Sequence, residues 1–251
     1  MFDKPKTEEL QYIAVDDENK ILFCALQKVA STTWFRLLKQ VHGFPPKSSR
    51  WDSFPRFSEF SEEERSFKLK TYFKFFFVRE PLQRLLSAYK HKFVRTPDHS
   101  KDIRKTMVQA LRPQDYEPQG ENFVSFSEFV QYFSSNISRN QHWRQYEKIC
   151  HPCAINYDFI GRFETMGDDG PVVLKMAGID DRATFPPIDG STGSDEVLEY
   201  YSQVPARYIR RMGEQYRNDF EMFGYEYLGP VKRLLNSVRR LRKKISATGK
   251  H

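Results

Sequence analysis

The chain has 251 residues, enough for one large domain or two small ones. Aromatic residues make up 15% of it, including 22 Phe and 13 Tyr, so we expect a sizeable apolar core and no extensive disorder. The net charge is +7, and the stretch from Pro230 to His251 holds eight Lys or Arg and no acid. The remaining body therefore carries 7 − 8 = −1, which argues against nucleic acid as a partner.

The domain organisation follows from the absence of a Gly/Ser- or Pro-rich linker. We predict one domain at residues 1–229, followed by a basic C-terminal helix or tail at residues 230–251. The tail has two interpretations that the sequence leaves open. It is either a solvated terminal helix packed on the domain or a contact for a polyanion or a membrane surface.

The N-terminal part predicts a β-hairpin that leads into a helix. YIAVDDENKILFCAL contains two short apolar runs around a turn at Asp16–Lys20. QKVASTTWFRLL follows, and we expect a helix from about Ser31 to Val41 that ends at His42–Gly43. Another helix is expected in SEEERSFKLK, because Ser61 followed by three Glu is an N-terminal helix signature.

A second strand-to-helix junction lies further along the chain. TYFKFFFVRE is almost entirely aromatic or β-branched, as in a buried strand. Pro81 then opens the helix PLQRLLSAYKHKF, with four large apolar residues on one face. The polar region from Val94 to Gly120 is expected to be mobile.

The remaining segments predict further helices and one more strand. SFSEFVQYFSS reads as an amphipathic helix and AINYDFIGRFE as a strand, followed by a helix from Asp168 or Pro171 to Ala177. DEVLEYYSQV and ARYIRRMGEQYRNDFEMFGY are helical. This alternation predicts an α/β fold with a central parallel sheet flanked by helices and a helical C-terminal half.

The two strand-to-helix junctions are candidates for an anion site, because ligands of parallel sheets bind at the C-terminal ends of strands. At the first junction, helix-start N–H groups and the hydroxyls of Ser31, Thr32 and Thr33 can cradle phosphate-like oxygens, with Lys28 as a point charge. A P-loop for Mg-nucleotides is disfavoured, because this loop has no Gly, Lys28 precedes the hydroxyls and no second strand ends in Asp.

At the second junction, the fork of Arg79 suits a bidentate phosphate contact, and Ser87 follows two helical turns later. The structural alternative for Arg79 is a salt bridge to Glu80 or Glu164.

The three cysteines leave two kinds of chemistry open. Cys24 lies in an apolar strand and is expected to be a buried small hydrophobe. Cys150 and Cys153 form CHPC, which fits either a zinc site completed by His151 or His142 or a short disulfide. No segment approaches the roughly 20 apolar residues of a membrane span. The N-terminus lacks the apolar region of a signal peptide.

Three segments in the same order resemble motifs of the Golgi carbohydrate sulfotransferases. QKVASTTWFRLL is similar to their 5′-phosphosulfate loop, and FVREPLQRLLSAYKHKF is similar to their 3′-phosphate motif. NQHWRQYEKICHPCAINYDFIGRFETM resembles a further segment of the family. The resemblance is greatest to the chondroitin/dermatan and N-acetylgalactosamine 4-O-sulfotransferases of sulfotransferase family 2. It implies a P-loop-like sulfotransferase fold.

The resemblance implies transfer of a sulfuryl group from 3′-phosphoadenosine 5′-phosphosulfate to a glycan hydroxyl, without a metal. The acceptor would be N-acetylgalactosamine in chondroitin/dermatan or a related glycan. Arg79 and Ser87 would bind the 3′-phosphate. The 5′-phosphosulfate would be bound by Gln27, Lys28, Val29, Ala30, Ser31, Thr32 and Thr33.

Lys28 would also neutralise the leaving phosphate, while a histidine would deprotonate the acceptor. His142 is the first candidate for this base, His91 the second, and Glu164 a further carboxylate. The structural alternative for His142 is a role in packing near Trp143 or Tyr146.

Gln27, Thr33 and Phe35 depart from the family pattern, which has Pro, Asn and Lys at these positions. We expect Phe35 to remove a charge near the sulfate. These departures motivate the alternative of a catalytically degraded relative that only binds nucleotide or glycosaminoglycan.

The family further implies a Golgi-lumenal glycoprotein, membrane-associated only through an anchor absent from this chain. In that compartment the CHPC pair would be oxidised rather than metal-bound, and Asn136-Ile137-Ser138 would be a glycosylation site.

Overall fold

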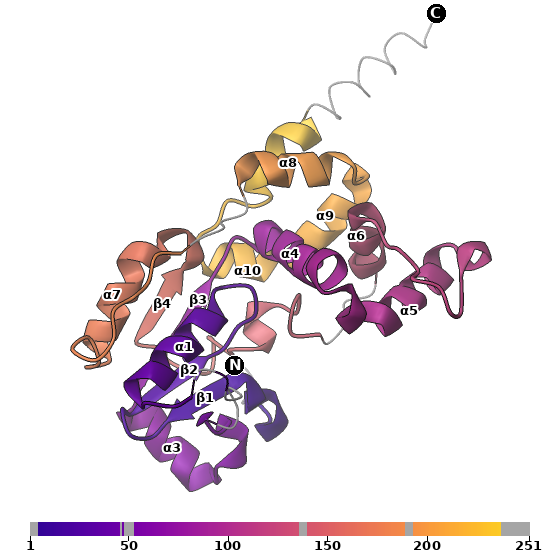
Figure 1. Cartoon of the computed structure of the whole chain (residues 1–251). Coiled ribbons are helices and arrows are strands. Elements are labelled where there is room, and N and C mark those ends of the chain that lie inside the picture. Colours follow the sequence, from indigo (N-terminus) through magenta and orange to yellow (C-terminus); the bar gives the residue numbers. More distant parts are fainter. Residues whose placement is uncertain (1–4, 46, 48–52, 136–139, 189–192, 237–251) are drawn as a thin grey trace, which may run out of the picture. The chain divides into compact units, whose positions relative to one another are not determined.

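The computed structural model describes residues 5–45, 47, 53–135, 140–188 and 193–236 (Figure 1). The chain divides into two compact units, the first from Met1–Arg79 and Asn140–Ser191 and the second from Glu80–Arg139 and Thr192–His251. The single domain expected over residues 1–229 stays a prediction, and most of the basic tail lies outside the described residues. Across the described ranges, no helix is long and apolar enough to cross a membrane.

The first unit contains a four-stranded sheet in the order β1-β2-β3-β4. Its strands are β1 (Ile13–Asp16), β2 (Ile21–Cys24), β3 (Phe73–Val78) and β4 (Phe159–Arg162). β1 and β2 form the predicted antiparallel hairpin, whereas β2, β3 and β4 run parallel. The α/β prediction is therefore confirmed, with a sheet that is parallel except for its first strand.

The helices described in the first unit lie close to where the sequence predicts them. They are α1 (Ser31–Val41), α3 (Glu62–Thr71) and α7 (Met166–Met176). The predicted capping box begins α3: Glu64 N donates to Ser61 Oγ at 3.2 Å, and Ser61 N donates to Glu64 Oε2 at 2.8 Å. Helix α7 begins earlier than Asp168 or Pro171, so Pro171 lies inside it.

The core of the first unit is an aromatic layer between α1 and the sheet. The buried Trp34 ring of α1 lies 5.3 Å from Phe77 and 4.8 Å from Phe75, and Phe75 stacks on Phe23 of β2. Gly161 in β4 permits this layer, because a Cβ there would come within 2.2 Å of the Phe77 ring. The near-continuous apolar run of β3 thus reflects a strand that is covered on both faces.

The cysteine predictions are wrong in their pairing. Cys24, expected as a reduced hydrophobe, forms a disulfide with Cys150. Cys153 lies outside this disulfide and is exposed, so the CHPC motif does not close on itself. The proposed zinc site also fails, because Cys150 is already bonded. The family resemblance favoured an oxidised CHPC pair, whereas the fold brings together Cys24 and Cys150, which are 126 positions apart.

The second unit is helical in its described residues. It contains α4 (Pro81–Tyr89), α5 (Lys101–Leu111), α6 (Phe126–Ser135), α8 (Ser194–Ser202), α9 (Ala206–Gln215) and α10 (Arg217–Met222). Its core is a cluster of rings in which Phe129 lies 5.4 Å from Tyr89, 5.2 Å from Phe93 and 4.8 Å from Phe133. The predicted helical C-terminal half is confirmed for α8, α9 and α10.

The region from Val94 to Gly120 contains helix α5, whereas we expected a polar, mobile segment. Helix α5 buries Met107 and Val108, and it also buries Arg104, whose Nη2 donates to the carbonyl of Pro97 at 3.1 Å. Polar composition misled the prediction, because the few apolar residues fall on one helical face.

The helix that follows Pro81 changes at Lys90 into a π-helix, Lys90–Arg95.

Candidate functional site

The β2–α1 loop, residues Gln27 to Ala30, is the first part of the candidate site. Lys28 and Ala30 both adopt left-handed backbone conformations, with φ of +72° and +59°. Such conformations are costly for residues other than Gly, and they persist in proteins mainly where the surroundings enforce them, often at ligand sites. Val29, 1% exposed, anchors the loop in the core and leaves Lys28 half-exposed.

The loop delivers the chain directly into the start of α1. The carbonyl of Ala30 accepts from the N–H groups of Thr33 at 2.9 Å and Trp34 at 3.3 Å, which begins the helix. Ser31 is buried, Thr32 is exposed and Thr33 is half-buried. The N–H groups at the start of an 11-residue helix, next to a lysine and three hydroxyl residues, make this junction suitable for an anion.

The residues that depart from the family pattern lie in different environments in the fold. The Phe35 ring is only 3% exposed and packs 5.6 Å from Phe23 and 6.1 Å from Phe54. The Phe35 side chain therefore enters the core, and the expected loss of a charge near the sulfate stays a prediction. Gln27 and Thr33 do belong to the loop and the first helical turn.

Arg79 is the second part of the candidate site, and it lies directly after β3. It is 2% exposed, and its guanidinium carbon lies 4.2 Å from the ring centroid of Phe163, which follows β4. The hydroxyl of Tyr146, in the short helix η6 (Tyr146–Lys148), contacts the Arg79 backbone. The sequence motifs predict a role for Arg79 but not for Phe163, although both lie in the family-like segments.

The segment before η6 carries His142, which also belongs to the first unit. His142 is 8% exposed, its backbone N–H donates to Asn140 Oδ1 at 3.0 Å, and its ring lies 6.2 Å from the Trp143 ring. Burial lowers the pKa of His151, nine positions further along the chain. In the residues that the structure describes, no group of three or more His, Cys, Asp or Glu side chains forms a metal site.

Ser87 and His91 belong to the second unit. Ser87 lies on α4, whose first turn is capped by Glu80 Oε2 accepting from Gln83 N at 2.7 Å. His91 lies in the π-helix, where its carbonyl accepts from the backbone and hydroxyl of Thr96. The structure thus places Lys28, Arg79 and His142 in one unit and these two residues in the other.

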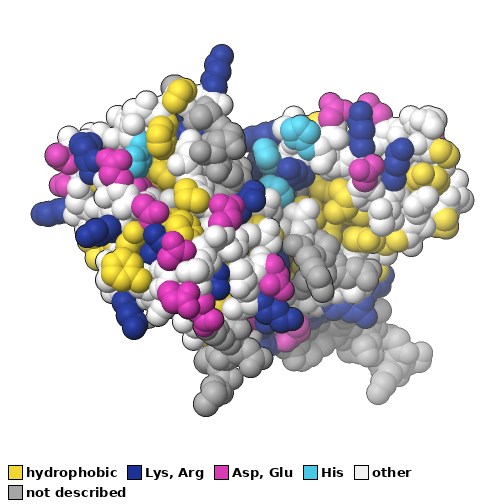
Figure 2. Space-filling view, turned by 90° about the horizontal axis from the view of Figure 1, so that it is seen from below, with side chains coloured by type: hydrophobic (Ala, Val, Ile, Leu, Met, Phe, Trp, Pro, Cys, Tyr) yellow, Lys and Arg dark blue, Asp and Glu magenta, His cyan; other side chains and the backbone are white. Residues whose placement is uncertain are grey.

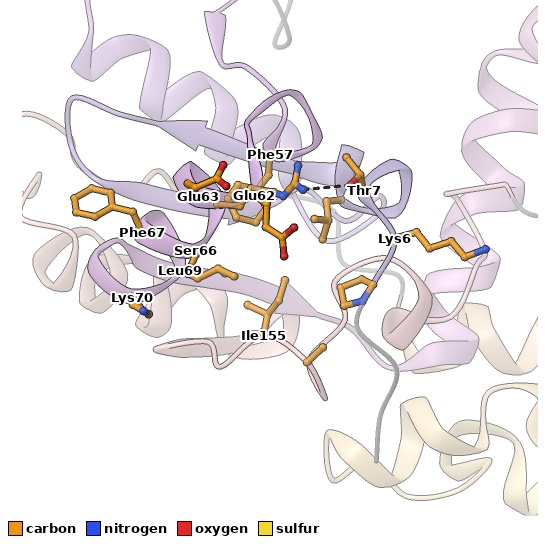
Figure 3. Close-up of a pocket in the computed structure, with 14 residues that line it drawn as sticks. Lys6, Thr7, Phe57, Glu62, Glu63, Ser66, Phe67, Leu69, Lys70 and Ile155 are labelled. Carbon is orange, nitrogen blue, oxygen red and sulfur yellow. Dashed lines mark hydrogen bonds between the residues drawn. The ribbon is translucent and has the colours of Figure 1, made fainter.

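A pocket of about 940 Å³ lies elsewhere in the first unit (Figure 3). Thr7, Glu62, Phe67 and Ile155 are among the residues that line it, whereas Lys28, Arg79 and His142 are not. On the face shown in Figure 2, Lys and Arg side chains are interspersed with Asp and Glu rather than forming one basic field. This agrees with the near-neutral body deduced from the sequence.

Comparison with known proteins places these features in a family. The model of a family described as "Sulfotransferase family" matches residues 11–226, a range that includes residues of both units. Carbohydrate sulfotransferase 10 of Pongo abelii is 37% identical over 243 residues, covering 86% of this chain and 67% of the relative. The human protein of the same name is 36% identical, with the same coverage.

Carbohydrate sulfotransferase 12 of Xenopus laevis is 31% identical over 261 residues, covering 89% of this chain and 62% of the relative. No solved structure matches. The sequence match extends through the β2–α1 loop and Arg79, which the fold places at the ends of neighbouring parallel strands. The chain belongs to the sulfotransferase family and is a sulfotransferase enzyme.

Proposed function

We propose that the donor is 3′-phosphoadenosine 5′-phosphosulfate. The observation that carries this proposal is the left-handed Lys28–Ala30 turn at the start of α1 in a member of the sulfotransferase family. Residues Gln27 to Thr33 would bind the 5′-phosphosulfate. Arg79 and Ser87 would bind the 3′-phosphate, and a buried guanidinium is suited to a doubly charged oxyanion.

The reaction is an in-line displacement at sulfur. The acceptor oxygen forms a bond to sulfur while the bond between sulfur and the 5′-phosphate oxygen breaks, which releases adenosine 3′,5′-bisphosphate. Lys28 stabilises the negative charge that develops on the leaving phosphate. A base takes the proton of the acceptor hydroxyl, and His142 is our first candidate, with His91 second.

The acceptor is a glycan. The names of the relatives, carbohydrate sulfotransferases 10 and 12, support this class of acceptor. N-acetylgalactosamine in chondroitin/dermatan or a related chain is our specific proposal, which follows from the family resemblance of the three sequence segments.

We propose that the enzyme acts in the Golgi lumen as a membrane-associated glycoprotein. The Cys24–Cys150 disulfide supports an oxidising compartment. The predicted glycosylation site at Asn136 lies outside the described residues.

The test is transfer of radiolabelled sulfate from the donor to desulfated chondroitin, dermatan and N-acetylgalactosamine-terminated glycans. Lys28→Ala should lower kcat by about 100-fold or more, because it removes charge stabilisation in the transition state. His142→Ala should abolish transfer but keep donor binding. Lys70→Ala is the matched control, because Lys70 is an exposed cation of α3 that lines the pocket in Figure 3.

Two results would contradict the proposal. Donor binding without transfer to any glycan would favour the catalytically degraded binder. Absence of donor binding would refute the assignment of residues Gln27 to Thr33.

A further inference from the structure

The backbone of Arg79 is held by a side chain rather than by a neighbouring strand. The last pair of the β3–β4 ladder is Val78 with Arg162, so Arg79 lies just beyond it. Its N–H donates to Tyr146 Oη at 3.1 Å, and the Tyr146 hydroxyl donates to its carbonyl oxygen at 2.5 Å. One hydroxyl therefore bonds both polar backbone groups of Arg79 and restricts its backbone dihedral angles.

The side chain of Arg79 is held by a different residue. Its guanidinium lies over the ring face of Phe163, with 4.2 Å between the guanidinium carbon and the ring centroid. This is the geometry of a cation–π contact, which leaves the edges of the planar guanidinium as the directions for hydrogen bonding. Tyr146 thus orients the Arg79 backbone and Phe163 orients its guanidinium, although neither aromatic residue is itself an anion ligand.

Tyr146 is itself fixed to the strand that leads into the β2–α1 loop. The N–H of Cys150 donates to the carbonyl of Tyr146 at 2.9 Å, and Cys150 is bonded to Cys24. Cys24 is the last residue of β2 and lies three positions before Gln27. The Tyr146 hydroxyl has no exposed surface, since the whole residue is 0% exposed, so its role is internal positioning.

We propose that Tyr146 and Phe163 are positioning residues that orient Arg79 for the 3′-phosphate of the donor. This inference rests on the proposed function, because it assumes that Arg79 binds this phosphate. The positioning role would explain what the family-like segment at residues 140–166 contributes to the site, because this segment contains both Tyr146 and Phe163. The consequence is selectivity: without these contacts the enzyme should distinguish poorly between nucleotides with and without a 3′-phosphate.

The test compares the dissociation constants of adenosine 3′,5′-bisphosphate and adenosine 5′-monophosphate by calorimetry. Tyr146→Phe should lower the ratio of the two affinities by about tenfold, because loss of the hydroxyl frees the Arg79 backbone. Tyr157→Phe is the matched control. It removes a tyrosine hydroxyl that donates to the Cys150 carbonyl at 2.7 Å in the same segment, and it should leave the ratio unchanged.

Phe163→Leu provides a second variant that removes no buried hydrogen bond. Loss of the ring face should lower the same ratio by about fivefold. If Tyr146→Phe does not fold, as judged by circular dichroism, Phe163→Leu decides the question. Wild-type selectivity in the folded variants would overturn the positioning role. If the wild-type enzyme itself does not select the bisphosphate, the donor assignment fails, and the positioning role fails with it.

Discussion

The two units hold their candidate functional residues in different ways. In the first unit, the Arg79 backbone is hydrogen-bonded to Tyr146, 67 residues away. Strand β2, which precedes the β2–α1 loop, is joined through Cys24 to Cys150, 126 residues away. In the second unit, Ser87 lies on a helix that begins with a local cap, Glu80 to Gln83, and with Pro81 at its first position. The candidate anion site of the first unit therefore depends on long-range contacts, whereas the start of α4 is specified by its own sequence.

Removing the disulfide should have the largest effect. The Cys24→Ser/Cys150→Ser double variant should lower the free energy of unfolding by about 4–5 kcal/mol, because the bond closes a long loop in the unfolded chain. Urea denaturation measures this loss, and hydrogen exchange should show the greatest loss of protection at β2 and the β2–α1 loop. Cys153→Ser, which changes an exposed thiol outside the disulfide, is the control. Equal stability of the two variants would show that the disulfide does not constrain the fold.

Truncation within the ring cluster of the second unit should have a somewhat smaller effect. Phe129→Ala should cost about 3–4 kcal/mol, because Phe129 is 0% exposed and its removal leaves a cavity among Tyr89, Phe93 and Phe133. Phe123→Ala is the control, since Phe123 is 66% exposed, and thermal unfolding compares them. Hydrogen exchange of the Phe129→Ala variant provides the contrary outcome. If amide protection were lost only at β2 and the β2–α1 loop, Phe129 would not belong to the core of the second unit.

The smallest loss of stability is expected at the start of α6, where the Glu128 carboxylate accepts from Ser125 N. This loss should depend on pH. Burial pushes the pKa of Glu128 up, but hydrogen bonds from Ser125 and Arg112 outweigh it and hold that pKa below its usual value. A carboxyl with a lowered pKa stabilises the fold above its unfolded pKa, near 4.5, and this contribution is lost as the pH falls through the folded value.

Glu128→Gln should therefore lower stability by at most about 1 kcal/mol at pH 7, and the difference from wild type should shrink in acid. Thermal unfolding between pH 7 and pH 3 measures this trend. A difference that grows as the pH falls would contradict it.

Much of the candidate site could be predicted because its motifs are continuous in sequence. Lys28 and the hydroxyls of Ser31 to Thr33 lie within six positions, and Arg79 directly follows an apolar strand. The sequence does not indicate Phe163, and it suggests Tyr146 only as a packing neighbour of His142. Their partner, Arg79, is distant in sequence, and no local pattern signals that contact. A sequence motif also does not show which of its side chains enter the core, as that of Phe35 does.

The sequence by itself determined the local elements: the hairpin around Asp16–Lys20, the capped helix at Ser61, the buried strand before Arg79 and the helix opened by Pro81. Each depends on backbone and side-chain preferences that act over a few residues. Only the tertiary structure decided the Cys24–Cys150 pairing. The same is true of the hydrogen bond between Tyr146 and Arg79 and of the cation–π contact between Phe163 and Arg79. These contacts join residues that the sheet and its covering segments bring together, and residue spacing carries no information about such proximity.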